Sequence, residues 1–196
     1  LRRNPKAAAN MQRMVDAAAK AAGYKVGKAF HGTRNKDFTV FKTGDLGHHF
    51  GLAEDQVFGE YGRFSKTPRD QVRLIAAYLN IQNPLELFDR GSWNRWLTVR
   101  KVNEKLGTSL SEQAATAADI QKAIKAAGYD GVEYENLHEG EEGGRAVIAF
   151  DSAQIKSADP VTRDESGQVI PLSQRFNEAT PDIRFSLAPR SAQDTE

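Results

Sequence analysis

The segment Ala146–Phe150 constrains the fold more than any other stretch of this sequence. Its five residues, Ala-Val-Ile-Ala-Phe, are all apolar. A short run that is apolar on both faces is typical of a strand buried in the middle of a sheet. Strand-like and amphipathic helical segments surround it in the sequence, without a regular βαβ alternation. We therefore predict an α+β fold with a split β-sheet or two-sheet core and peripheral helices.

The chain divides into three parts by composition. Residues 1–23 are alanine-rich and predict an amphipathic N-terminal helix or linker. Residues 24–159 contain the strand and helix signals and form the predicted central domain. Residues 160–196 are polar and proline-containing, with no sustained hydrophobic period. They predict a weakly ordered C-terminal tail.

One of the helices predicted inside the central domain is indicated by its hydrophobic spacing. Pro68 suits the first helical position, and Val72, Ile75, Ala76 and Leu79 then recur at intervals of three and four residues. These four side chains would share one face of a helix.

Composition excludes several classes of function. The chain has no cysteine, which removes disulfides, thiol catalysis and thiolate metal sites. Its four histidines lack metal-ligand spacing, so we expect no metal. A net charge of +1 argues against a sequence-blind nucleic-acid binder. No apolar run approaches the roughly 18 residues that span a bilayer, so we expect no membrane partner and a cytoplasmic location.

The stretch Phe30-His31-Gly32-Thr33 ends the first predicted strand. At a strand end, the His31 imidazole can bond a ribose hydroxyl, and Gly32 lets a planar amide approach the backbone. Thr33 and Arg34 add a hydroxyl and a cation suited to a diphosphate. The alternative is an ordinary structural histidine.

A second histidine and a tyrosine predict a stacking site. His49 lies in Gly47-His48-His49-Phe50-Gly51, and Tyr61 follows it by twelve residues across a short predicted helix. Two rings arranged in this way can hold a flat ring such as nicotinamide between them. The alternative is that His49 is a loop residue and Tyr61 fills the core.

Acidic residues precede the Ala146 strand, in the segment 133–142. A carboxylate beside a ribose stabilises the oxocarbenium-like state of glycosidic cleavage, and it can orient a nucleophile. The alternative is a solvated acidic hairpin. The residues concerned are Glu133, Glu135, Glu139, Glu141 and Glu142.

The order of these motifs resembles the ADP-ribosyltransferase superfamily, on its diphtheria-toxin and poly(ADP-ribose) polymerase side, with its His–Tyr–Glu signature. The chain is more similar still to the ADP-ribosyltransferase domains in polyvalent proteins of phages and other mobile elements. That likeness covers about residues 28–186, and its most specific blocks are 148–157 and 180–186.

The resemblance implies a split-sheet clamp around NAD as substrate, without a metal. His31 matches the first signature residue, His49 stands where the signature has tyrosine, and Tyr61 stands where a second stacking tyrosine is found. The resemblance implies NAD-binding residues His31, Gly32, Thr33, His49, Phe50 and Tyr61.

The third signature position departs from the pattern, because Ala146 stands where the superfamily has its catalytic glutamate. We expect the acid to come from the adjoining loop, as Glu139 or Glu142, beside His31 and His49 as catalytic residues. The absence of the signature glutamate favours mono-ADP-ribosylation. The expected acceptor is a macromolecule, a host protein or a nucleic acid, attacked by a phage or mobile-element effector. A degenerate NAD- or ADP-ribose-binding module and an NAD-dependent RNA 2′-phosphotransferase are the alternatives.

Overall fold

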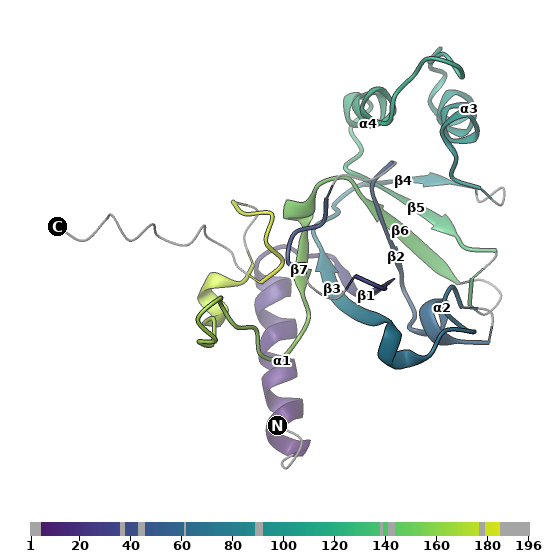
Figure 1. Ribbon diagram of the computed structural model, residues 1–196. Coiled ribbons are helices and arrows are strands. Elements are labelled where there is room, and N and C mark those ends of the chain that lie inside the picture. The colour runs from purple at the N-terminus through teal and green to yellow at the C-terminus, as the bar shows by residue number, and fades with distance from the viewer. Residues whose placement is uncertain are drawn as a thin grey trace.

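The sheet predicted from the Ala146 strand is the core of the molecule. The computed structural model describes residues 5–35, 38–42, 46–60, 62–88, 92–137, 139–140, 144–176 and 179–184. Seven strands form one mixed sheet in the order β4-β5-β6-β2-β1-β3-β7 (Figure 1). Their bounds are β1 Val26–Thr33, β2 His48–Gly51, β3 Arg73–Leu79, β4 Pro84–Leu87, β5 Gly131–Glu135, β6 Arg145–Ala149 and β7 Ile155–Ser157.

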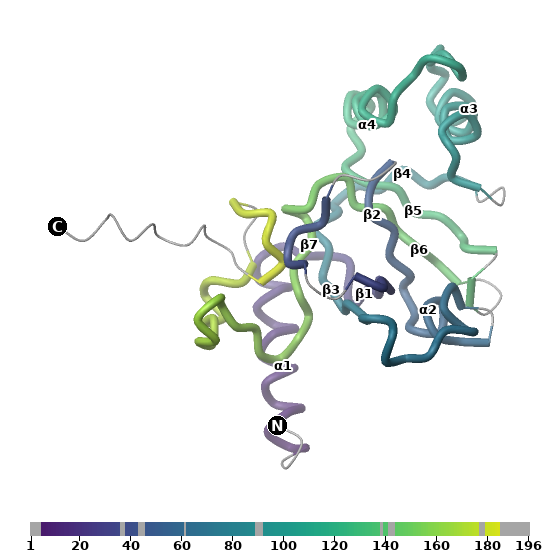
Figure 2. Tube along the Cα trace, in the orientation of Figure 1, coloured from purple at the N-terminus to yellow at the C-terminus, as the bar shows by residue number. Residues whose placement is uncertain are grey.

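The sheet is split between β1 and β2, as the resemblance implied. β1 pairs with β3 through six residue pairs, from Val26–Leu79 to Thr33–Arg73. Its pairing with β2 is limited to Phe30 and Gly51. The two halves of the sheet meet at this pair, and Figure 2 shows β7, β3 and β1 to the left of β2, β6, β5 and β4.

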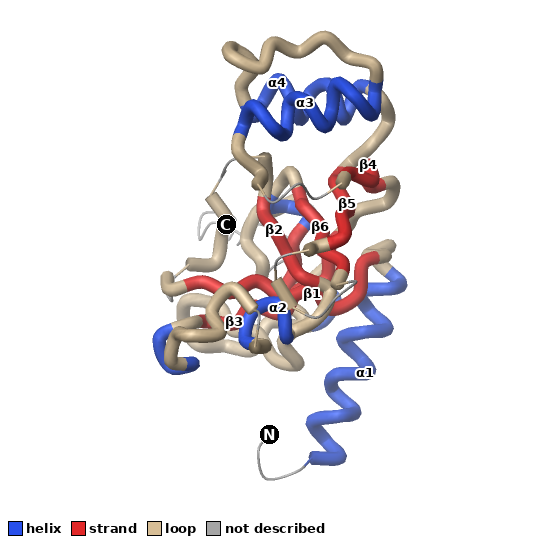
Figure 3. Tube along the Cα trace, turned by 90° about the vertical axis from the view of Figure 1, so that its right-hand side faces the viewer, coloured by secondary structure: helices blue, strands red, loops and turns tan. Residues whose placement is uncertain are grey.

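Two helices, α3 (Arg95–Leu106) and α4 (Ala117–Ala126), cover the half formed by β4, β5, β6 and β2 (Figure 3). Capping side chains define their first turns: Asn94 accepts from the Leu97 backbone N–H at 3.1 Å, and Thr116 forms a capping box with Asp119. Their buried faces meet the sheet in one core cluster, whose members include Leu85, Val99, Val102, Ile120, Ile124, Val132 and Ile148.

The other half of the sheet packs against α1 (Pro5–Ala21). The alanine-rich segment is helical, as predicted, and buries Val15 and Ala19 against Tyr24 and Tyr78. The Tyr78 hydroxyl also donates to Asp16 of α1. α1 therefore supports the face of β3 that points away from the split.

The predicted helix after Pro68 is wrong. Residues 73–79 form strand β3, which lies between β1 and β7. Ile75, Ala77 and Leu79 pack into one core cluster, and Ala76 and Tyr78 face another. Because both faces of β3 are covered, apolar residues occupy consecutive positions, and part of that run coincides with helical spacing.

The described part of the segment beyond residue 160 packs on β7 and α1, although its composition is polar. The buried Lys156 ammonium donates to the Thr180 and Asp182 carbonyls at 2.6 and 3.0 Å. The buried Arg175 guanidinium donates to the Ser157 and Asp159 carbonyls at 3.1 and 2.6 Å. These cations bond main-chain oxygens that regular sheet pairing leaves open.

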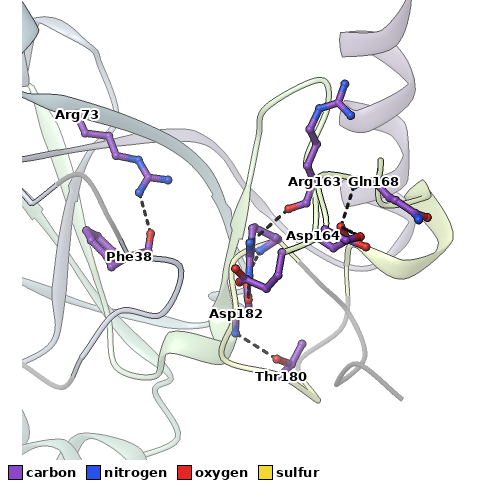
Figure 4. A network of polar contacts seen from close by, with 10 residues as sticks. Phe38, Arg73, Arg163, Asp164, Gln168, Thr180 and Asp182 are labelled. Atoms are coloured by element: carbon purple, nitrogen blue, oxygen red, sulfur yellow. Dashed lines mark hydrogen bonds and ion pairs between the residues drawn. The ribbon is translucent and has the colours of Figure 1, made fainter. Parts of the chain in front are cut away.

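Hydrogen bonds and ion pairs at the surface connect residues of this segment (Figure 4). The Asp182 backbone N–H donates to Thr180, and the Gln168 N–H donates to Asp164 at 2.8 Å. Arg184 contacts both Asp182 and Glu165, and its bond to Asp182 is the main cause that raises its pKa. The division of the chain at residues 23 and 159 stays a prediction.

Among the described helices, none is both long and apolar enough to cross a membrane.

Candidate active site

A narrow cavity lies where β1 and β2 separate. It has a volume of about 30 Å³, which is room for one or two water molecules. Two walls enclose it. The first comes from β1 with α2 (Asp55–Phe58) and the segment after it, and the second from β2, β5, β6 and the β5–β6 loop. The lining residues are Phe30, His31, Gly32, His49, Phe50, Gly51, Gln56, Val57, Arg63, Phe64, Tyr134, Asn136, Glu139 and Ala146.

His31 is fixed by a backbone contact across the split. Its Nδ1 lies 2.8 Å from the His49 carbonyl oxygen. Because a carbonyl oxygen only accepts, Nδ1 carries the proton, and Nε2 of the neutral ring is left as an acceptor. Burial lowers the pKa of His31, and Arg63 lowers it further against the effect of the His49 bond. The ring is therefore neutral at pH 7 and can accept a hydrogen bond from a hydroxyl.

The ring of His31 rests on aromatic neighbours. Its centroid lies 5.2 Å from that of Phe41 and 5.4 Å from that of Phe50. Phe50 is 1% exposed. It therefore supports His31 from the core side and leaves the outer edge of the imidazole free for contact.

Gly32 lies directly beneath side chains of the first wall. A Cβ added there would lie 2.6 Å from Cγ1 of Val57 and 2.7 Å from Cε2 of Phe64. These distances are too short for any side chain, so only glycine allows Phe64 to close over β1. A nicotinamide ring can reach the Gly32 backbone only if Phe64 and Val57 move aside.

Two guanidinium groups flank the Phe64 ring. The Cζ atoms of Arg34 and Arg63 lie 6.0 and 5.9 Å from its centroid. Both distances are at the outer limit of a cation–π contact. The positive charge at this end of the cavity suits a phosphate-bearing ligand.

His49 is held by side chains of the second wall. Its Nδ1 lies 3.0 Å from the Tyr134 hydroxyl, and its ring meets Trp93 edge-on at 5.6 Å. Trp93 lies against Tyr134 at 4.5 Å, and the Lys101 ammonium sits 3.7 Å from the indole centroid. His49 is thus one member of an aromatic cluster that extends from the cavity to α3.

Ala146 lies in the cavity wall, opposite Gly51 of β2 and Tyr134 of β5. It brings no charge to the site. The neighbouring Arg145 pairs instead with Glu133 at 2.7 Å. Ala146 therefore supplies no carboxylate to the cavity, and the nearby carboxylate of Glu133 is paired with Arg145.

Among the residues that the structure describes, Glu139 supplies the carboxylate that lines the cavity. Asn136, which is 5% exposed, holds it at two points. The Glu139 backbone N–H donates to Asn136 Oδ1 at 3.0 Å, and Asn136 Nδ2 donates to Glu139 Oε2 at 3.3 Å. The loop acid is thereby tied to the end of β5, near both histidines.

The predicted site residues divide into three groups. His31, Gly32, His49, Phe50 and Glu139 line the same cavity. Thr33 ends β1, and its hydroxyl accepts from the Asn35 N–H at 3.1 Å, so it begins the following loop and is outside the cavity lining. Tyr61 and Glu142 lie outside the described residues.

The cavity lining also includes Asn136, Tyr134, Gln56, Arg63 and Phe64, which were not predicted as site residues. Asn136 and Tyr134 lie at the end of a predicted strand, whose alternation places Tyr134 on the side of Val132 and gives no sign of a bond to His49. Nothing in the sequence marked Gln56, Arg63 or Phe64. They reach the cavity because α2 lasts only one turn and the chain then folds back over β1.

No group of three or more His, Asp or Glu side chains within the described ranges is placed to hold a metal ion.

Comparison with known proteins identifies the family. Residues 25–164 match the sequence profile of a family described as ADP-ribosyltransferase in polyvalent proteins. Comparisons with curated protein sequences and with solved structures gave no significant match. The match covers more than half of the chain, and it includes the split sheet and both walls of the cavity. The chain therefore belongs to the family of ADP-ribosyltransferases found in polyvalent proteins.

Proposed function

We propose that this protein is a mono-ADP-ribosyltransferase that cleaves the bond between nicotinamide and ribose in NAD and transfers ADP-ribose to a macromolecular acceptor. Family membership supplies the general chemistry, ADP-ribosyl transfer with NAD as substrate. The observation that carries the specific proposal is that Glu139 lines the same cavity as His31 and His49, although Ala146 offers no carboxylate.

The polar groups of the cavity fit a nucleotide. The free Nε2 of His31 accepts from a ribose hydroxyl, and Gly32 leaves room for the carboxamide at the backbone once Phe64 has moved. His49 provides a ring for nicotinamide, and we assign Tyr61 the same role. Arg34 and Arg63 lie where positive charge favours the diphosphate.

The proposed reaction breaks the C1′–N bond, and its electron pair leaves with nicotinamide. Positive charge then develops on the ribose, and the Glu139 carboxylate stabilises it. An acceptor oxygen or nitrogen attacks C1′ and gives up its proton. Glu139 can take that proton, since Asn136 bonds only Oε2 of the two carboxylate oxygens.

We propose a host protein as acceptor, with nucleic acid as the alternative, and the cytoplasm of the host cell as the setting. The family description supports a phage or mobile-element effector by its reference to polyvalent proteins. We propose single transfer because Ala146 stands where the superfamily has its catalytic glutamate, and the absence of that glutamate favours mono-ADP-ribosylation.

Ala146 favours a second candidate, a module that binds NAD or ADP-ribose without turnover. The two candidates share the cavity and differ in whether Glu139 reaches the ribose. A binding module keeps its NAD affinity when Glu139 is changed to Gln, and it releases no nicotinamide.

Nicotinamide release from NAD by the purified chain, with and without host lysate, tests the proposal. We expect release that His31→Ala removes, and more release with lysate because it contains the acceptor. The matched control is Gly27→Ala on the same strand, where an added Cβ meets nothing within 4 Å.

Other results would redirect the proposal. A thermal shift with NAD that His31→Ala abolishes, without release, establishes the binding module. NAD-dependent removal of an RNA 2′-phosphate would identify a phosphotransferase. No release and no shift with wild-type protein would refute both candidates.

A further inference from the structure

Gln56 is a buried polar residue that neither the family signature nor the proposed reaction uses. It lies on α2 and is 2% exposed. Its Oε1 accepts from the Ala53 backbone N–H at 3.1 Å, which fixes the orientation of the amide. Its Nε2 is buried and has no hydrogen-bond partner among the residues that the structure describes. Buried donors without a partner are rare in folded proteins and call for an explanation.

Glycines make the space that Gln56 occupies. A Cβ on Gly51 would lie 2.6 Å from its Oε1, and one on Gly140 would lie 2.5 Å from its Cγ. Gly51 faces Ala146 across the strand pair. The Gln56 amide therefore lies beside the small pair Gly51–Ala146, at the place where the cavity wall lacks its signature carboxylate.

The same packing brings Gln56 close to the loop acid. Gly140 directly follows Glu139, and its positive φ of 90° is a backbone conformation that other residues rarely adopt. Glu139 and Gln56 both line the cavity. One presents a carboxylate, which only accepts, and the other presents an N–H group, which only donates.

We propose that Gln56 is a substrate-binding residue whose Nε2 donates a hydrogen bond to a ribose hydroxyl oxygen, while Glu139 accepts a hydrogen bond from a hydroxyl on the same sugar. A hydroxyl both donates and accepts, so a sugar can satisfy an unpaired donor and an acceptor side by side. Two carboxylates in these positions would repel each other, and two amides would leave the developing positive charge without an anion. This inference rests on the proposed function and adds the group that fixes the ribose.

The decisive variant is Gln56→Glu, which keeps the size of the side chain and the acceptor for the Ala53 N–H but replaces the free N–H group with oxygen. At pH 8 we expect about tenfold weaker binding of nicotinamide mononucleotide, because a donor is lost beside Glu139. Binding of nicotinamide alone, which has no ribose, should not change. Isothermal titration measures both probes.

The pH dependence separates this role from a structural one. The introduced carboxyl titrates above about 4.3, because burial and Glu139 both disfavour its charge. Once protonated, it offers an O–H donor. The ratio of wild-type to variant affinity should therefore fall toward one between pH 8 and pH 5. His31, His49, Arg63 and Glu139 also face the cavity, in the wild-type protein and in the variant.

A second variant, Gln56→Met, guards against a folding defect, since it has a similar volume and no polar atom. We expect it to unfold near the wild-type temperature, and to lose affinity for the mononucleotide but not for nicotinamide. Equal affinity of all three proteins for the mononucleotide would overturn the inference and leave the proposed function intact. Loss of affinity for both probes in a folded variant would also overturn it, because the contact would not be to the ribose. If wild-type protein binds neither probe, the proposed function fails together with the inference.

Discussion

The two walls of the cavity are built in different ways. The β1 wall depends on the main chain and on close packing. Its glycine lies under Phe64 and Val57, and His31 donates to a backbone carbonyl. The wall of β2, β5 and the loop depends on bonds between side chains, His49 with Tyr134 and Asn136 with Glu139.

Because of this difference, the two walls are sensitive to different kinds of substitution. Added volume damages the β1 wall, because strand pairing with β3 on the other side leaves it no room to move. Loss of a polar atom damages the second wall, because hydrogen bonds between side chains position its functional groups. We therefore expect steric changes to be most harmful in the first wall and isosteric changes to be most informative in the second.

The largest effect is expected from Gly32→Val. Its Cβ would lie within 3.0 Å of Val57 and of two carbons of Phe64, so the segment over β1 must shift. Overpacking of this kind costs about 1–3 kcal/mol of unfolding free energy. We also expect nicotinamide release to fall more than about 100-fold, as misplaced reacting groups lose that much.

Gly27→Val provides the matched control for that prediction. It adds the same side chain to the same strand at a position with nothing within 4 Å. Denaturant unfolding and release assays should leave it within about 0.5 kcal/mol of wild type. Similar losses in both variants would show that β1 tolerates no valine anywhere, and that the contact with Phe64 is not the cause.

A polar change in the second wall comes next in size. Glu139→Gln keeps the shape of the loop residue and removes its charge. Nicotinamide release should fall about 100-fold with little change in NAD affinity, since the charge matters most in the transition state.

Two comparisons sharpen the Glu139 prediction. Asn136→Ala removes the side chain that holds the carboxylate, so we expect an intermediate loss of release. Glu135→Gln removes a charge from an exposed position at the end of β5 and should have no effect. If Glu139→Gln and Glu135→Gln behave alike, the loop acid is not the catalytic one.

The sequence predicted the walls better than it predicted what covers them. β1, β5 and β6 follow from short apolar or alternating runs, and the family blocks placed His31, Gly32 and His49. Glu139 was predicted as one of two loop acids, because a strand with alanine at the key position directs attention to the loop beside it.

The elements that sequence reasoning missed depend on contacts distant along the chain. β3 is a strand because β1 and β7 pair with it on both sides, which its own helical spacing does not reveal. Gln56 belongs to a single helical turn whose pattern does not differ from that of a surface helix. Its burial follows from Gly51 and Gly140, and no local signal relates those glycines to it.

Tyr134→Phe measures how much the second wall depends on one hydroxyl. The ring keeps its place against Trp93, and the bond to His49 is lost. A single neutral hydrogen bond contributes about 1 kcal/mol. We therefore expect a roughly fivefold rise in the Michaelis constant for NAD. Tyr129→Phe, in the same half of the molecule, is the control and should leave the Michaelis constant for NAD unchanged.

The smallest effect concerns the pH dependence of stability, and it arises from His31 on β1 and His48 on β2. Burial lowers the pKa of His31 and of His48, the latter with a further contribution from His31 that Asp151 opposes. The unfolded chain therefore binds more protons than the folded chain once the pH falls below the ordinary histidine value of about 6.5. The neutral rings contribute their full stabilisation above that pH. This contribution is lost as the pH falls toward the lowered pKa values of His31 and His48. Denaturant unfolding at pH 7.5, 6 and 5 should show this decline, since most carboxylates titrate lower, near pH 4.

His48→Gln should make the decline shallower without affecting nicotinamide release at pH 7.5. A variant that declines as steeply as wild type would mean that His48 takes up its proton as easily in the folded chain as in the unfolded one.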